Sequence, residues 1–217
     1  MRLGRPRFLN RILKYKHILL SLVFLIQIVW FFYCEKTVVP KHIMYSPLDD
    51  YIPFVKEFVI AYVLWYVYMP AGFIYLAIVS KKDYYKLLIY MFTGMTISQI
   101  LYIIYPSMQN LRPVITGTDI FSRAVHYIYS IDTPTNVTPS VHVVNSMAVY
   151  ISLAGSPKIS KKRWIKVLLF VFTFLIIAST MFIKQHSIVD VFWGIALSCI
   201  LYIFIFPLIE FIKRRKH

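Results

Sequence analysis

Six long apolar runs limit the folds that are open to this chain. They cover residues 17–33, 58–79, 87–105, 139–154, 164–183 and 189–212, and the fourth run is the shortest. A helix needs about 20 apolar residues to cross the hydrocarbon core of a bilayer. None of the runs alternates polar and apolar residues as an outer-membrane β-strand does. The sequence therefore predicts an all-α polytopic membrane protein, with six transmembrane helices in one bundle that forms a single domain over residues 1–217.

The overall composition supports this class and excludes several others. Hydrophobic residues make up 59% of the chain and charged residues only 15%, whereas about 25% of a soluble domain is charged. This contrast excludes an ordinary cytosolic enzyme, a disordered chain and a disulfide-rich secreted domain. Cys34 and Cys199 lie far apart, in or beside apolar runs. We therefore expect neither a disulfide framework nor a cysteine metal site.

The net charge of +15 is explained by membrane topology. Eighteen of the 24 Lys and Arg residues, but only two of the nine acids, lie in residues 1–16, the turns near residues 81 and 161, and the C-terminal tail. The positive-inside rule then places both termini in the cytoplasm of a multi-pass protein of the cell membrane. The basic segments need no nucleic-acid partner, although membrane lipids with anionic headgroups could bind them. The oligomeric state stays open.

Two segments outside the apolar runs are amphipathic or basic and need a separate interpretation. The basic residues 1–16 are interpreted as a tail that sets the topology, with an amphipathic helix on the lipid surface as the alternative. The extracytoplasmic loop 106–138 contains an amphipathic segment at about 119–131 and leads to the candidate site. Asp132, Thr133, Thr135 and Asn136 precede that site. They line it or form a turn, and the sequence favours neither.

Four ionisable residues mark the candidate site. His142 opens the fourth run, His186 and Asp190 lie between the fifth and sixth, and Arg112 follows the third. Ionisable groups at membrane depth are costly and usually functional. The topology was set by Lys and Arg counts alone, yet it brings all four residues to one side. We therefore expect a site that faces the extracytoplasmic side.

The spacing of the ionisable residues favours a histidine nucleophile. His186 and Asp190 are four residues apart, so on a helix they share one face. A carboxylate beside an imidazole fixes the tautomer and stabilises the imidazolium, which suits a nucleophilic histidine. His142 could protonate a leaving oxygen.

The segment before His142 is predicted to begin a helix. Pro139 suits the first helical position, with Thr138 as its N-cap. The free backbone N–H groups of residues 140–142 would then be available to bind phosphate.

Three motifs, in this order, resemble those of the type-2 phosphatidic acid phosphatase superfamily. That family carries Lys-x6-Arg-Pro, then Pro-Ser-Gly-His, then Ser-Arg-x5-His-x3-Asp. The matching segments here are Leu111-Arg112-Pro113, Pro139-Ser140-Val141-His142, and Ser179-Thr180 followed by His186 and Asp190. The match extends over about residues 105–190, and the six-span layout extends it to the whole chain.

The resemblance implies a mechanism and a role for each residue. His186 attacks phosphorus to form a phosphohistidine, Asp190 orients His186, and His142 acts as general acid and then base. No metal ion and no other cofactor is required. The positions that hold the phosphoryl oxygens, through side chains or backbone N–H groups, are Arg112, Ser140, Val141, Ser179 and Thr180.

The chain departs from the family pattern at three positions. Tyr105 stands where the family has Lys, Val141 where it has Gly, and Thr180 where it has Arg. Two phosphate-binding cations are thus absent from their usual places. Lys184, two residues before His186, could replace one of them. Alternatively, it extends its amine to the membrane surface from the end of the fifth span.

Three functions are consistent with the sequence. The first is a lipid-phosphate phosphatase that hydrolyses a monoester or diphosphate at the outer leaflet. The second is a headgroup phosphotransferase resembling sphingomyelin and inositol-phosphorylceramide synthases, since a phosphodiester donor carries less charge. The third is a non-catalytic transporter or scaffold, against which the intact His142, His186 and Asp190 argue. Two histidines and an aspartate could also bind a metal ion, but no fourth ligand with suitable spacing follows.

Overall fold

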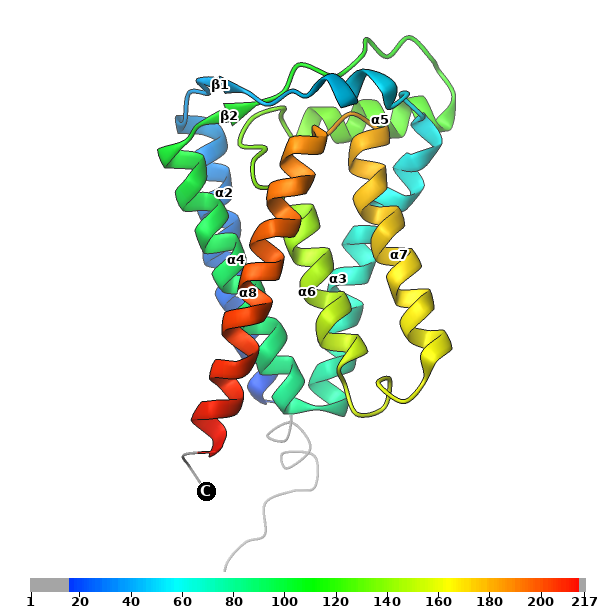
Figure 1. Ribbon diagram of the computed structural model, residues 1–217. Coiled ribbons are helices and arrows are strands. Elements are labelled where there is room, and N and C mark those ends of the chain that lie inside the picture. The colour runs from blue at the N-terminus through cyan, green and yellow to red at the C-terminus, as the bar shows by residue number, and fades with distance from the viewer. Residues whose placement is uncertain (1–15, 215–217) are drawn as a thin grey trace, which may run out of the picture.

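The computed structural model describes residues 16–214, with side chains up to residue 209, and shows a bundle of helices under a layer of loops (Figure 1). The prediction of an all-α bundle is confirmed. The interpretation of residues 1–16 lies outside the described residues, except for Lys16. The elements in chain order are η1 (Lys16–Val23), α2 (Phe24–Thr37), β1 (His42–Ile43), η2 (Pro47–Tyr51), η3 (Lys56–Phe58), α3 (Val59–Val79), α4 (Lys81–Ile104), β2 (Ser107–Met108), α5 (Ile120–Ile131), α6 (Val141–Ala154), α7 (Arg163–Phe182) and α8 (Ile188–Arg214).

Five helical segments of the described chain are long and apolar enough to cross a membrane. They are Lys16–Thr37, Lys56–Val79, Lys81–Ile104, Arg163–Phe182 and Ile188–Ile209. The apolar helix α6 has 14 residues, which correspond to about 21 Å of helix. Its first turn lies below the upper ends of α7 and α8, because the chain before it descends between the helices (Figure 1). Only residues 139 and 140 of the predicted span 139–154 lie outside this helix, in the irregular segment above it.

Helix α6 forms the centre of the bundle. It contacts α3, α4, α7 and α8, and its inward side chains join the main hydrophobic core. Three glycines, one each on α3, α4 and α8, allow these helices to approach it closely. A Cβ atom added at Gly72, Gly94 or Gly194 would lie 2.6 to 2.8 Å from a valine of α6. Small residues at such contacts permit dense packing of membrane helices.

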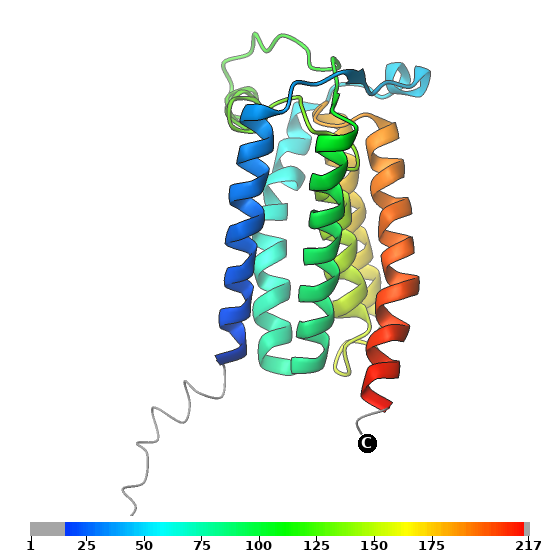
Figure 2. The ribbon, with the colours of Figure 1, turned by 90° about the vertical axis from the view of Figure 1, so that its left-hand side faces the viewer.

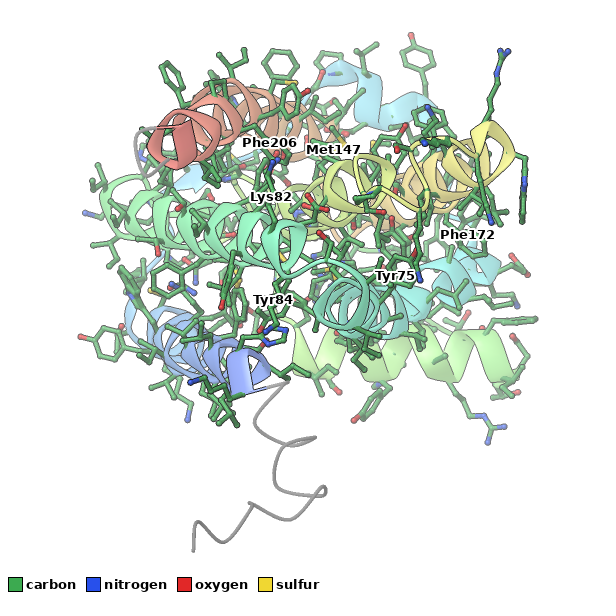
Figure 3. The ribbon with its side chains drawn as sticks, turned by 90° about the horizontal axis from the view of Figure 1, so that it is seen from below. Tyr75, Lys82, Tyr84, Met147, Phe172 and Phe206 are labelled. Carbon is green, nitrogen blue, oxygen red and sulfur yellow. The ribbon has the colours of Figure 1, made fainter. Side chains whose placement is uncertain are left out.

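The lower end of the bundle joins the first helical segment to α4. The hydroxyl of Tyr84 accepts a hydrogen bond from Ser21 at 2.6 Å and donates to the carbonyl of Ile18 at 3.2 Å. Seen from below, Tyr84 points from α4 toward η1 (Figure 3). The turns around residues 80 and 155–162 lie at this same end (Figures 1 and 2).

The upper end is closed by the two long loops and α5. Strand β1 pairs in parallel with β2, and Met108 bridges to Thr135 in antiparallel fashion. The amphipathic segment predicted at about 119–131 forms α5, with Asp119 as its N-cap. These segments lie at the end opposite the basic turns, so the fold separates the same groups of segments as the charge count (Figures 1 and 2).

Candidate active site

Two histidines from distant parts of the chain meet near the upper end of the bundle. His142 lies in the first turn of α6, and His186 lies in the short loop before α8. Nδ1 of His142 is 3.3 Å from Nε2 of His186, and both side chains are buried. The structure therefore brings together the two residues to which the sequence assigns the chemistry.

Asp190 orients His186. Its Oδ2 lies 3.4 Å from Nδ1 of His186 and accepts the backbone N–H of Ser187 at 2.8 Å. Its Oδ1 accepts a hydrogen bond from the hydroxyl of Thr138. The carboxylate is fully buried, so it is held by these contacts in one position. A proton on Nδ1 of His186 then leaves Nε2 free to act as a nucleophile.

A second set of polar residues orients His142. Its Nε2 lies 2.9 Å from the hydroxyl of Tyr62, which donates to Oδ2 of Asp132 at 2.7 Å. The side-chain amide of Gln185 donates to the same carboxylate oxygen at 2.9 Å. Because the Tyr62 proton is committed to Asp132, the phenolic oxygen accepts the proton of His142 Nε2. Nδ1 of His142 therefore faces Nε2 of His186.

The prediction for the start of α6 is wrong. Ser140, and not Thr138, is the N-cap, and Val141 is the first helical residue. The backbone N–H of Ser140 donates to the carbonyl of Asp190 at 3.2 Å, so it is not free for phosphate. The hydroxyl of Thr138, which would otherwise cap a helix, binds Asp190 instead. A tertiary contact thus moves the helix start beyond Pro139.

Arg112 is held by the loop that carries Asp132. Its guanidinium donates to the carbonyl of Asp132 at 2.6 Å and to that of Tyr129 at 3.3 Å, and it lies 4.3 Å from the Tyr129 ring centre. Burial lowers the pKa of Arg112, but an arginine keeps its charge in proteins. In this arrangement Arg112 supports the segment that positions His142.

The other candidate phosphate ligands have partners away from the two histidines. The hydroxyls of Ser179 and Thr180 donate to backbone carbonyls of the preceding turn of α7, at 2.6 and 2.7 Å. The amine of Lys184 donates to the carbonyls of Asp49 and Ile52, at 2.9 and 2.5 Å. Phosphate binding by these three residues stays a prediction. Thr180 has a different contact with the site, since its carbonyl accepts the backbone N–H of His186 at 3.0 Å.

A small cavity of about 20 Å³ lies beside the two histidines, which is room for about one water molecule. Its described lining contains Asp132 but no Lys or Arg. This lining also includes Thr133, Thr135 and Asn136. Their position agrees with the interpretation that they line the site. A phosphoryl group fits between the histidines only if they separate. Among the described residues, no cluster of His, Cys, Asp and Glu is arranged to hold a metal ion.

Sequence reasoning missed the residues that orient His142. Tyr62 lies 80 residues away from it, in an apolar run that contains other tyrosines, and carries no local signal. Asp132 was noted only as a residue near the site. Gln185 had one signal, its position next to His186.

The comparison with protein families gives one result for this chain. A family model described as the PAP2 superfamily matches residues 83–214. This range runs from α4 to α8 and includes Arg112, His142, His186 and Asp190. No curated protein and no solved structure matches the chain.

Proposed function

Since the chain belongs to the PAP2 superfamily, we propose that it is a membrane enzyme that transfers the phosphoryl group of a lipid phosphate to water at the extracytoplasmic leaflet. One observation carries the proposal. Nε2 of His186, whose other nitrogen faces Asp190, points at a second oriented histidine 3.3 Å away. This arrangement supports the roles of His186 as nucleophile and His142 as proton donor on a phosphoryl group bound between them.

In the first step, the Nε2 lone pair of His186 attacks phosphorus, and the bond between phosphorus and the lipid oxygen breaks. His142 starts doubly protonated and donates the proton of Nδ1 to that oxygen, so the lipid leaves as an alcohol. The product on the enzyme is a phosphohistidine. Asp190 stabilises the positive charge that His186 gains in this step.

In the second step, a water molecule attacks phosphorus and gives its proton to His142. The bond between phosphorus and His186 breaks, its electron pair returns to Nε2, and inorganic phosphate is released. Both histidines regain their starting protonation states. The proposed scheme uses no metal ion.

A phosphotransferase is the second candidate, and the lining of the small cavity favours it. The described lining lacks Lys and Arg, and a phosphodiester donor carries less charge than a monoester. In this variant the same phosphohistidine forms, and a lipid alcohol takes the place of water. The same three residues would serve both reactions.

Phosphate release by the purified protein in detergent, with EDTA present, tests the proposal. The substrates are phosphatidate, phosphatidylglycerol phosphate and undecaprenyl diphosphate. Release that disappears in His186→Ala supports the phosphatase. A new lipid product that depends on a phosphodiester donor, without free phosphate, supports the transferase. Normal turnover by the His186→Ala protein would contradict both.

A further inference from the structure

The loop that carries His186 has a left-handed backbone conformation at Lys184. This residue follows the C-cap of α7, Ile183, and its φ is 54°. Helices often end with a residue in this conformation, but it is usually glycine, because a Cβ atom makes the conformation strained. Strained residues persist where the surrounding structure holds them, and they cluster at functional sites. A lysine is therefore expected here only if its side chain does something that glycine cannot do.

The side chain of Lys184 binds the end of η2. The residue is 9% exposed, and its amine donates to the carbonyls of Asp49, in η2, and of Ile52, the C-cap of η2. A lysine amine suits this position, because the last carbonyls of a helix carry partial negative charge. A buried ammonium group is costly unless such partners hold it. The amine is thereby committed to η2, which lies above the loop between α7 and α8 (Figure 1).

The same short element also holds the loop on the other side of His186. The carboxylate of Asp49 accepts the hydroxyl of Ser187 at 2.6 Å and the backbone N–H of Ile188 at 2.8 Å. Ser46 and Asp49 form a capping box that closes the start of η2, which stabilises this turn by itself. One capped turn therefore binds the chain both before and after His186.

From this two-sided contact we infer that Lys184 is a positioning residue. Its amine holds the loop against η2, so that Nδ1 of His186 stays beside Asp190 and Nε2 stays directed at His142. The inference rests on the proposed function and adds to it a residue that touches no reacting atom. This role differs from the two that the sequence left open for Lys184, a phosphate ligand and a lysine that extends to the membrane surface.

Steady-state kinetics of phosphate release from phosphatidate separates these three roles. Lys184→Gly removes the amine and relieves the left-handed strain, whereas Lys184→Met removes the charge and keeps a long side chain. In both variants kcat should fall about 10- to 100-fold, because small displacements of a reacting group are that costly, while KM changes less than about twofold. Lys184→Arg, which can donate to the same carbonyls, should recover most of the lost kcat.

Lys41→Met is the matched control. Lys41 is an exposed lysine between α2 and β1, at the same end of the bundle, so this variant removes one positive charge from the same face. Its kcat and KM should equal those of the wild type. A raised KM with little change in kcat in the Lys184 variants would make Lys184 a phosphate ligand. Unchanged kcat and KM would show that the contact with η2 does not position His186. Either result overturns the inference.

The tautomer of His186 gives a readout that needs no turnover. Nitrogen NMR of the full-length protein in detergent, with isotope-labelled histidine and at mildly alkaline pH, distinguishes protonated from unprotonated ring nitrogens of neutral imidazoles. Comparison with His186→Ala assigns the signals. The wild type should carry the His186 proton on Nδ1 alone, whereas Lys184→Gly should show both tautomers.

The two readouts together separate the inference from the proposed function. If the spectra of the wild type and Lys184→Gly differ in this way but none of the lipids is hydrolysed, the proposed function fails and the positioning role stands. Identical His186 signals in the two proteins would refute the positioning role, whatever the rate of phosphate release.

Discussion

The hydroxyl of Tyr62 decides which nitrogen of His142 faces the substrate. Its oxygen accepts a hydrogen bond from Nε2 of His142, and its O–H donates a hydrogen bond to Asp132. In Tyr62→Phe the imidazole loses this partner and can adopt the wrong tautomer. We expect kcat to fall about tenfold, less than the full contribution of a positioned general acid, while KM changes little.

Steady-state kinetics on phosphatidate tests the role of Tyr62. The control is Tyr68→Phe, because Tyr68 is on the same helix and its hydroxyl also has a side-chain partner, Thr173, at 3.0 Å. That variant should keep its kcat. An unchanged kcat in Tyr62→Phe would show that His142 needs no such partner.

Residues of the site could be predicted when their signal was local. Spacing and the predicted topology indicated that His142, His186 and Asp190 lie on one side of the protein, and the structure brings them together. Tyr62 could not be found, because its contact with His142 joins two helices 80 residues apart. For Lys184 the sequence left two roles open, and it did not indicate that the amine binds carbonyls of a loop more than 130 residues earlier. Such a contact depends on how the loops pack, which a single sequence does not encode locally.

An aspartate from a segment distant in sequence caps the N-terminus of α8. Asp49 of η2 accepts the backbone N–H of Ile188 at 2.8 Å and the hydroxyl of Ser187 at 2.6 Å, and it is 2% exposed. Asp49→Ala leaves both donors unpaired. The free energy of unfolding should fall by about 1–3 kcal/mol, and turnover should fall with it because His186 lies two residues before this helix.

Thermal unfolding in detergent and phosphate release measure the two effects of Asp49→Ala. Asp50→Ala is the control, since Asp50 is the exposed neighbour that binds only the hydroxyl of Tyr45 among the described contacts. It should change neither quantity appreciably. If both variants had the same melting temperature and the same rate of phosphate release, Asp49 would not stabilise the start of α8.

Helix α5 should become less stable in acid. Asp119 caps it by accepting the N–H groups of Phe121 and Ser122, and it pairs with Lys56 at 2.6 Å. The hydrogen bond from Lys56 holds the pKa of Asp119 well below its usual value of 3.8. A carboxylate with a lowered folded pKa stabilises the fold above its unfolded pKa, and this contribution disappears as the pH falls through the folded value.

Hydrogen exchange of residues 120–131 measures this local stability. Asp119→Asn should exchange faster than the wild type at pH 7, and the difference should shrink as the pH is lowered below about 4. A difference that does not depend on pH would mean that the charge of Asp119 contributes nothing.

Elements were predicted well where one physical signal dominated. Long apolar runs predicted the five long spans, and amphipathic spacing predicted α5. The predicted start of α6 was wrong, because the hydroxyl of Thr138 donates a hydrogen bond to Asp190 and does not cap the helix. The sequence pattern predicts local capping, and here a contact between the segment before α6 and the first turn of α8 replaces it.

The packing of the whole bundle depends on close approach to α6. A Cβ at Gly194 would lie 2.8 Å from Cβ of Val143 and 3.1 Å from the carbonyl of Ser140. Gly194→Ala therefore pushes α8 away from α6 at the level of the active site. We expect a loss of about 1–3 kcal/mol in the free energy of unfolding, typical of overpacking, together with lower turnover.

Melting temperature and phosphate release again provide the measurements. Gly155→Ala is the matched control, because Gly155 ends α6 with φ of −82° and an added Cβ would meet only the carbonyl of Ile151 at 3.3 Å. That variant should resemble the wild type. If Gly194→Ala were as stable as the wild type, α6 and α8 could accommodate a methyl group at this contact, and close packing there would not be required.

The charge distribution predicts an orientation for the whole molecule, which can be tested at two exposed positions. Val114 is 89% exposed in the upper loops, and Lys161 is exposed in the lower turn between α6 and α7. In a Cys34→Ala, Cys199→Ala background, a cysteine at 114 should react with a membrane-impermeant maleimide in intact cells. A cysteine at 161 should react only after permeabilisation, because basic turns stay in the cytoplasm.

The same pair of positions tests whether α6 crosses the membrane. Only α5 and α6 lie between residues 114 and 161, and α5 lies across the top of the bundle (Figure 1). Opposite labelling of the two cysteines therefore requires α6, together with the irregular segment above it, to count as a crossing despite its 14 residues. Labelling of both from outside would make α6 re-entrant and place the basic turn after it on the outer face. Labelling of residue 161 alone would invert the molecule, turn the histidine pair toward the cytoplasm, and contradict the proposed action on the extracytoplasmic leaflet.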